Sequence, residues 1–157
     1  MISSAAEYAL RAVVCLADRA AGKPMTAQEI ARITQSPPGY MAKILQGLGR
    51  ASVVTSQRGP TGGFRLNHEL DAISVLDVIN AVDPLPRIHK CPLGLEAHKD
   101  QLCSLHSRID HALLEVERSF GDTTIGDLLR DPGASYPLGG VIRRNGSDPD
   151  VDVDLAP

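Results

Sequence analysis

One segment of this 157-residue chain, TAQEIARITQSPPGYMAKILQGL at residues 26–48, constrains the fold more than any other. Thr26 and Glu29 have the S/T-x-x-E spacing of a capping box, in which each side chain bonds the other residue's backbone N–H at a helix start. A short helix is therefore expected over residues 27–34, and the QSPPG that follows must end it because proline cannot continue a helix. Because a second helix follows at once, the segment predicts a helix-turn-helix.

The second helix of this pair is expected to bury one face and expose the other. Ser36 is predicted to cap it, with Pro37 at the first position, where a missing backbone N–H does no harm. Apolar residues at i, i+3, i+4 and i+7 predict one buried stripe, made of Met41, Ile44, Leu45 and Leu48. The opposite face is predicted to carry Tyr40, Lys43, Gln46, Gly47 and Arg50.

The next residues, VVTSQRGPTGGFRLN, predict a β-hairpin with strands over residues 53–57 and 63–67 around a Gly/Pro turn. A hairpin directly after a helix-turn-helix is a wing, so the predicted fold class is mainly α with a small β-hairpin wing. Arg58 lies at the predicted tip, where a guanidinium suits the narrow minor groove of A·T-rich DNA. The alternative is an ordinary solvated turn that contains an arginine.

The helix-turn-helix and the wing predict double-stranded DNA as the partner, and the charge distribution is compatible with a basic N-terminal half that meets phosphate. The net charge is −3, but residues 1–67 hold eight Lys/Arg against three Asp/Glu (+5), and residues 68–157 hold eight against sixteen (−8). Tyr40 and Lys43 can reach phosphates and Gln46 can read adenine, unless this face is merely solvated with Tyr40 half-packed. The residues predicted to contact DNA are Thr26, Ser36, Gly39, Tyr40, Lys43, Gln46 and Arg50 in the helix pair, and Ser56, Arg58 and Gly59 in the wing.

A long helix is predicted after the cysteine-containing stretch. Its apolar residues are spaced 3, 4, 3, 4 and form an a/d seam of about two heptads: Leu102, Leu105, Ile109, Ala112 and Val116. Such a seam either packs on its own domain or pairs with its twin in a homodimer.

Other helix starts are predicted from cap residues: Ser3 or Ser4 for a first helix to about Ala20, Ser74 with Asp77, and Thr124 with Asp127. Residues 131–157 have no sustained apolar period, which predicts a disordered acidic tail. The predicted domains are residues 1–83 for DNA binding, 84–104 for a Cys/His sensor loop, 105–130 for the dimerisation helix with its capping turn, and 131–157 for the tail.

The stretch CPLGLEAHKDQLCSLH, residues 91–106, concentrates candidate ligands in a chain with only three cysteines. Cys91 and Cys103 can form a reversible disulfide if their Cα atoms lie within about 7 Å. With His98 and His106 they can instead form a Cys₂His₂ zinc site, although the spacing is unlike that of a usual zinc finger. The remaining alternative is purely structural, with Cys103 packed at the head of the long helix and Cys91 in a loop.

Composition and motifs also narrow the class of protein. An odd cysteine count and no N-terminal signal segment predict a reducing, cytoplasmic setting, with Cys15 as a buried small hydrophobe. The apolar N-terminal run is interrupted by charges, so no membrane span is expected. A nucleophile–base arrangement and a phosphate-binding loop are both missing from the sequence, which predicts that the chain is not an enzyme.

Several motifs, in order over about residues 1–130, resemble the IscR/NsrR/CymR family of winged-helix transcription regulators: AAEYALRAVVCLA, the helix pair, SQRGPTGGFRL, the Cys/His stretch and TTIGDLL. The resemblance implies a homodimer paired through the long helix that binds palindromic operators. It also implies that Arg58 is the minor-groove arginine and that residues 40–43 begin the groove-facing surface. Ala42 stands where cluster-sensing members can carry an acidic residue that tunes operator choice, so this tuning is not expected here.

The same resemblance raises the question of a cofactor, because many members sense iron–sulfur, nitric oxide or redox status through a cluster and others carry none. Cluster-bearing members have three cysteines with x5 and x5 spacing, and some add a histidine after x2. Cys91, Cys103 and His106 match, but Ala97 occupies the second position. A [2Fe–2S] cluster needs four protein ligands, so His98 and Glu7 of the partner subunit are the further candidates. One alternative is that the site holds zinc. Another is that the regulator carries no cofactor and is controlled by a partner protein, by a small molecule or by a Cys91–Cys103 thiol switch.

Overall fold

The computed structural model describes residues 2–18 and 23–131, and this part of the chain confirms the predicted fold class, since it is mainly helical with one two-stranded antiparallel hairpin. In chain order the elements are α1 (Ser4–Asp18), α2 (Ala27–Ile33), α3 (Pro38–Arg50), β1 (Val54–Gln57), β2 (Gly63–Leu66), η1 (Leu70–Ala72), α4 (Val75–Asn80), η2 (Glu96–His98), α5 (Ser104–Asp122) and α6 (Ile125–Arg130). Helices α2 and α3, followed by the hairpin, form a winged helix-turn-helix.

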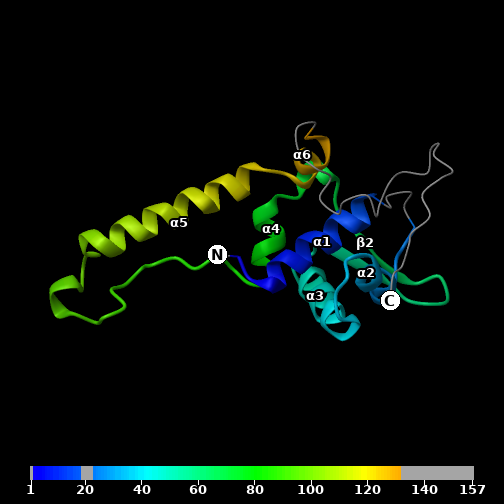
Figure 1. The fold of residues 1–157 in the computed structure, drawn as a ribbon, viewed down its shortest axis with the longest axis horizontal. Coiled ribbons are helices and arrows are strands. Elements are labelled where there is room, and N and C mark those ends of the chain that lie inside the picture. Colours follow the sequence, from blue (N-terminus) through cyan, green and yellow to red (C-terminus); the bar gives the residue numbers. More distant parts are fainter. Residues whose placement is uncertain (1, 19–22, 132–157) are drawn as a thin grey trace, which may run out of the picture.

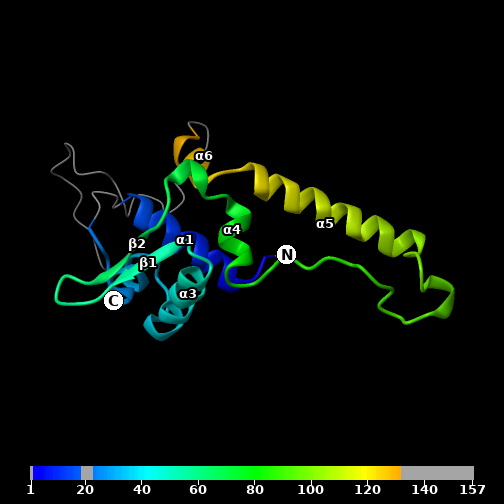
Figure 2. The same ribbon diagram turned by 180° about the vertical axis from the view of Figure 1, so that it is seen from behind.

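The described chain consists of a head and one projecting helix (Figure 1). Helices α1–α4, α6 and the hairpin form the head, and α5 extends away from it. A segment that we call the arm, residues 84–90, runs from the head along α5 to the Cys–His loop, residues 91–106, at the outer end of that helix (Figure 2). The turn of the hairpin projects from the opposite side of the head, so the wing and the Cys–His loop lie at opposite ends of the molecule.

The core of the head is built around α1, which contacts α2, α3, α4, β2 and α6. Three alanines on this helix, Ala6, Ala9 and Ala12, have no exposed surface, and their small side chains let neighbouring helices pack closely. The predicted stripe of α3 is confirmed, because each of its apolar side chains is at most 4% exposed: Met41, Ile44, Leu45 and Leu48. Burial of each such side chain stabilises the fold by about 1.5–3 kcal/mol.

Helix starts follow the predicted caps. Reciprocal capping boxes begin three helices: Thr26 with Glu29 at α2, Ser74 with Asp77 at α4, and Thr124 with Asp127 at α6. At α1 the Ala6 backbone N–H donates to Ser3 Oγ over 3.2 Å, which makes Ser3 the cap. The predicted end of the first helix near residue 20 lies outside the described residues, as do residues 132–157 of the predicted tail.

Two predictions about α3 are wrong. Ser36 does not cap it, because the helix begins at Pro38 with Pro37 in the cap position and no side-chain cap bond. The Ser36 side chain instead turns inward, is 8% exposed, and shares a 3.1 Å hydrogen bond with the buried Thr34 hydroxyl. Gly47, predicted on the exposed face, is buried, since a Cβ there would lie 3.1 Å from the carbonyl oxygen of Ala81.

The wing is joined to the helix pair through its second strand. Val54 pairs with Leu66 and Gln57 with Gly63, so each predicted strand was one residue too long. Met25, just before α2, exchanges two backbone hydrogen bonds with Phe64, of 3.0 and 2.7 Å. This bridge sets the base of the wing against the start of the helix-turn-helix.

The long helix α5 has no buried residue in this chain. Its inner end contacts α4, and Phe120 packs against the core of the head. The outer part of the predicted seam stays open, with Leu105 63% and Ile109 41% exposed, so it does not pack on its own head. Within residues 2–18 and 23–131, no helix is both long and apolar enough to cross a membrane.

Candidate nucleic-acid interface and Cys–His loop

The polar face of α3 is open to solvent as predicted. Capping at Thr26 and the buried stripe of α3 fix the two helices, and this fold leaves the following α3 residues exposed: Gly39, Tyr40, Lys43, Gln46 and Arg50. Thr26 is also exposed, although its hydroxyl is engaged by Glu29 at 2.8 Å. Ser36 is the exception among the predicted contacts, because it is buried.

Tyr40 is held in place by residues of α1 that sequence reasoning did not single out. The ring of Tyr8 meets the ring of Tyr40 edge-on, with centroids 5.7 Å apart and planes at 79°. The guanidinium of Arg11 lies 5.6 Å from the Tyr8 ring centroid and 3.9 Å from the Glu7 carboxylate. Edge-to-face aromatic contacts and cation–π contacts of this kind orient side chains at the surface. Tyr40 is therefore half-packed, one of the two arrangements considered from the sequence.

The wing presents its predicted residues to solvent. Ser56, Arg58 and Gly59 are all exposed, on β1 and at the turn that follows it. Arg65 on β2, which pairs with Thr55, adds a second exposed cation that sequence reasoning missed. The sequence could have predicted its exposure, because Arg65 lies between Phe64 and Leu66 and successive side chains of a strand point to opposite faces.

The Cys–His loop contains two separate thiol–imidazole pairs. Cys91 Sγ lies 3.3 Å from His98 Nδ1, and Cys103 Sγ lies 3.2 Å from His106 Nδ1. Both thiols are free and half-buried, and Cys103 occupies the N-cap position of α5. Cys15 is fully buried in α1, as predicted.

A cluster or zinc site requires more ligands than either pair supplies. Zinc and [2Fe–2S] sites both need four ligands. Among the described residues, no three His, Cys, Asp or Glu side chains are close enough together to hold a metal ion. Glu7 is directed at Arg11 on its own helix, far along the chain from the loop. The residues of one chain therefore do not fit a preformed cluster or zinc site.

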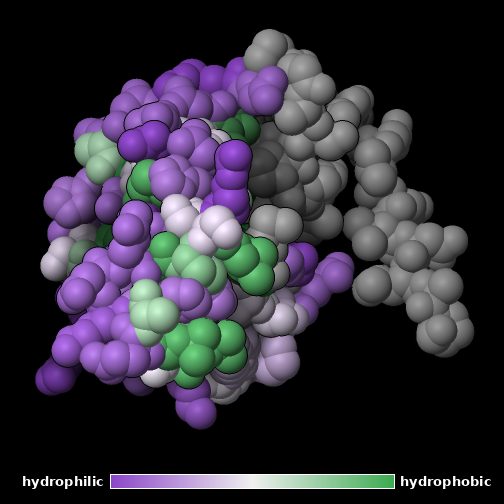
Figure 3. Space-filling model, turned by 90° about the vertical axis from the view of Figure 1, so that its left-hand side faces the viewer, coloured by the Kyte–Doolittle hydropathy of each residue, from purple (hydrophilic) through white to green (hydrophobic). Residues whose placement is uncertain are grey.

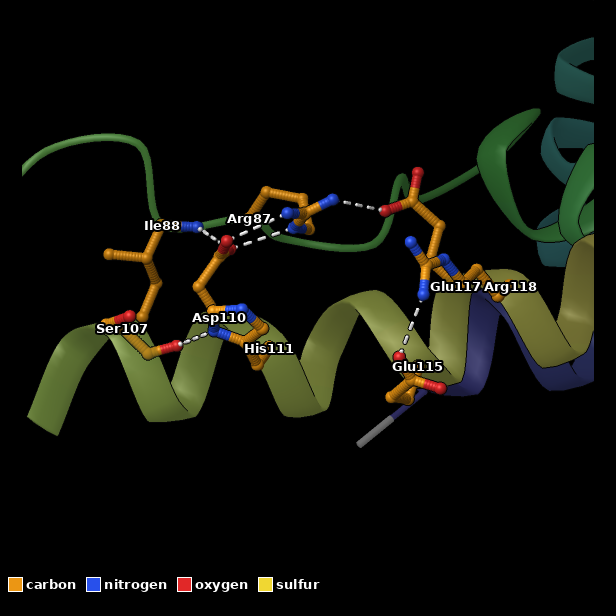
Figure 4. A network of polar contacts seen from close by, with 8 residues as sticks. All are labelled: Arg87, Ile88, Ser107, Asp110, His111, Glu115, Glu117 and Arg118. Atoms are coloured by element: carbon orange, nitrogen blue, oxygen red, sulfur yellow. Dashed lines mark hydrogen bonds and ion pairs between the residues drawn. The ribbon is translucent and has the colours of Figure 1, made fainter. Parts of the chain in front are cut away.

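A polar clamp joins the arm to the middle of α5 (Figure 4). Arg87 donates to both oxygens of Asp110 at 2.8 Å and to Glu117 at 2.8 Å, and the Ile88 backbone N–H donates to Asp110 at 2.9 Å. These bonds, first the Arg87 guanidinium and then the Ile88 N–H, hold the pKa of Asp110 well below its usual range. No sequence pattern links positions so far apart, although Asp110 and Glu117 are seven residues apart and so share a helix face.

Solved structures with the same fold are found among bacterial regulators. CymR (YrzC), the global cysteine regulator of B. subtilis, matches with a TM-score of 0.68 and 26% identity over 82% of this chain and 95% of that chain. T. potens IscR matches with a TM-score of 0.68 and 23% identity over 83% and 87% of the two chains. The oxidized form of S. aureus CymR matches with a TM-score of 0.64 and 20% identity over 83% and 96%.

The helix pair and the wing define the chain as a winged helix-turn-helix protein of the DNA-binding transcription regulator class. Residues 2–131 match the Rrf2 family, described as "Iron-dependent Transcriptional regulator". The chain therefore belongs to the Rrf2 family. Membership confirms the predicted resemblance, the DNA-binding regulatory role and the prediction that the chain is not an enzyme.

Proposed function

We propose that this Rrf2 regulator acts as a homodimer that binds a palindromic operator and changes its affinity in response to chemistry at the Cys–His loop. In this proposal each head places α3 in a major groove and the wing in the adjacent minor groove. The two half-sites would lie about one helical turn apart, because both heads must reach the same side of the duplex.

The observation that carries the homodimer is the exposure of α5. A 19-residue helix with no buried residue gains little from its own chain, because most helix stability in proteins comes from tertiary packing. Large apolar side chains reach the surface at this end of the molecule (Figure 3): Leu93, Leu95, Leu105 and Ile109. The a/d spacing of the seam favours a second copy of the same helix as the partner.

The proposed DNA-contacting surface consists of the exposed face of α3 and the wing. Lys43 and Tyr40 would contact phosphates, Gln46 would contact a base edge, and Arg58 would enter the minor groove. Their exposure and the +5 charge of residues 1–67 support this assignment. Ser36 is not part of the proposed surface because it is buried.

For the signal we propose redox, nitric oxide or iron–sulfur status, with thiol chemistry at Cys91 and Cys103 as the favoured form. An imidazole nitrogen within 3.3 Å of each thiol supports this choice, because it is placed to accept the proton that the sulfur loses when it reacts. A [2Fe–2S] cluster would require the loop to rearrange and a further ligand, such as Glu7 of the partner subunit.

A second candidate signal is a small polar molecule bound in the head. A cavity of about 420 Å³ lies between the end of α3, the start of the wing and α4, and its polar lining includes Ser52, His68, Asp77 and Asn80. This volume lies within the range of small-molecule sites in proteins. Occupancy there would act on the wing without involving either thiol.

The deciding experiment uses duplex DNA selected from a random library by the purified protein. Affinity for the selected duplex is measured by fluorescence anisotropy under reducing and oxidising conditions, for wild type and the Cys91→Ala, Cys103→Ala double variant. We expect a redox-dependent affinity in wild type and a constant affinity in the double variant. Constant affinity in both would refute the thiol signal, and failure to select any duplex would refute operator binding. Iron, zinc and sulfide analysis after anaerobic purification tests the cluster.

A further inference from the structure

The clamp fixes one residue of the arm at one level of α5. Arg87, Asp110 and Glu117 are only 23%, 18% and 33% exposed, and Arg87 meets Asp110 through two parallel bonds. Side-chain bonds alone would allow the arm to slide, because an arginine side chain has several rotatable bonds. The Ile88 backbone N–H donating to Asp110 removes this freedom, since the backbone itself is then held.

This level determines how far along α5 the segment that carries Cys91 extends. Figure 4 shows that the arm runs antiparallel to α5, so beyond Ile88 it continues toward the start of the helix. Cys91 lies three residues beyond Ile88, which an extended chain covers in about 10 Å. Cys103 lies seven residues before Asp110, which a helix covers in about 10 Å. By these lengths Cys91 and Cys103 fall at about the same level along the axis of α5, with each thiol beside its own histidine.

We propose that Arg87 and Asp110 are positioning residues for the Cys91 and Cys103 thiols. The clamp sets the register of the arm on α5, and this register makes the two thiols level with each other. The inference rests on the proposed role of the loop as a sensor and names the contact that sets the position of Cys91 relative to Cys103. Without the clamp, the segment from residue 84 to Cys103 is a long tether, and Cys91 samples many levels of the helix.

The test measures how readily one reagent joins the two thiols. The reduced full-length protein is treated with bis-maleimides of increasing span, each thiol adding across one maleimide double bond. Crosslinks between two chains are separated by mass, and the Cys91–Cys103 product within one chain is identified by peptide mapping. Wild type should give a sharp optimum at one short span. Arg87→Gln and Asp110→Ala should broaden this optimum and lower its yield at least about threefold.

Matched controls come from the exposed Glu115–Arg118 pair on the same helix, whose side chains are 71% and 62% exposed. Arg118→Gln and Glu115→Ala should leave the span profile unchanged. Alanine is the replacement chosen at position 110 because it favours the helix, so Asp110→Ala should not unfold α5. Far-UV circular dichroism checks that the helix content is unchanged. A wild-type profile in both clamp variants, or no intramolecular product in wild type at any span, overturns the inference.

Affinity for selected DNA is measured on the same samples. Loss of the crosslink in the clamp variants together with redox-independent DNA binding in wild type would refute the proposed signal while leaving the positioning role intact. An unchanged crosslink with redox-dependent binding would refute the positioning role alone.

Discussion

Single residues decide how the wing meets the helix pair and what it presents. Gly63 follows the turn with φ +154°, and a Cβ at this position would lie 2.6 Å from the carbonyl carbon and oxygen of Met25. Only glycine lets the two backbones come close enough for the Met25–Phe64 bridge. Arg58, in contrast, is exposed at the turn and is free of packing constraints of this kind.

Gly63→Ala should destabilise the protein by about 1–3 kcal/mol, because the new methyl group collides with backbone and the φ angle becomes strained. Urea unfolding followed by circular dichroism measures the change. Gly49→Ala is the control, because a Cβ at this helical position would meet no atom within 4 Å. This substitution should leave the unfolding free energy unchanged or raise it by up to about 1 kcal/mol. Equal effects of the two substitutions would contradict the close approach.

Arg58→Ala should weaken binding to selected DNA by about 1–3 kcal/mol while the unfolding free energy stays within about 0.5 kcal/mol of wild type. The loss should be larger for duplexes with A·T pairs beneath the wing, where the minor groove is narrow. Anisotropy titrations with A·T and G·C versions of one duplex measure this. Arg118→Ala, remote on α5, is the control, and an equal loss from both variants would contradict a minor-groove contact.

Among the elements, α5 and the arm depend on each other. The helix has no buried residue of its own, and the arm has no regular secondary structure from residue 84 to 89. The clamp is a bidentate arginine–carboxylate contact with a second carboxylate, the geometry in which ion pairs are most effective. The stabilisation that the clamp provides depends on the ionised form of Asp110, so the attachment of the arm to α5 should be sensitive to acid.

Acid should loosen the arm. The folded-state pKa of Asp110 lies below its ordinary value of 3.8, so its stabilising contribution is complete above that value and is lost as the pH falls below it. Between about pH 5 and about pH 3, thermal unfolding should therefore shift down more for wild type than for Asp110→Asn. Asp100→Asn, at an exposed loop position, should behave like wild type. Equal acid shifts for wild type and Asp110→Asn would contradict the clamp.

For the whole molecule, the proposed dimer would place two heads at the ends of paired α5 helices. The wing and the Cys–His loop lie at opposite ends of one chain, so a change in the loop must travel along α5 or across the pair to reach DNA. Paired helices would offer a stiff connection for that purpose.

Ile109→Asp should dissociate the proposed dimer, weakening self-association at least about tenfold, because a charge replaces an apolar seam residue. Sedimentation velocity over a concentration series measures the change, and affinity for palindromic DNA should fall with it. His111→Asp is the matched control, because His111 is an exposed residue of the same helix that lies outside the a/d seam, and this variant should remain dimeric. A wild-type protein that stays monomeric at high concentration would contradict the dimer outright.

The sequence by itself determined the parts of this protein that depend on local spacing. The capping boxes, the apolar stripe of α3, the hairpin and the a/d spacing of α5 each follow from residues within a few positions of one another, where propensity and hydrogen bonding act directly. These features were enough to predict the fold class and the exposed DNA-contacting candidates.

Only the tertiary structure decided contacts between residues distant in the chain. Ser36 had the chemistry of a cap, but a buried partner, the Thr34 hydroxyl, drew it inward. The pairing of Tyr8 with Tyr40 and of Arg87 with Asp110 depends on how whole helices pack, which no local spacing encodes. The cysteines and histidines of the loop form two separate pairs for the same reason, because the path of the arm along α5 decides where Cys91 and His98 lie relative to Cys103 and His106.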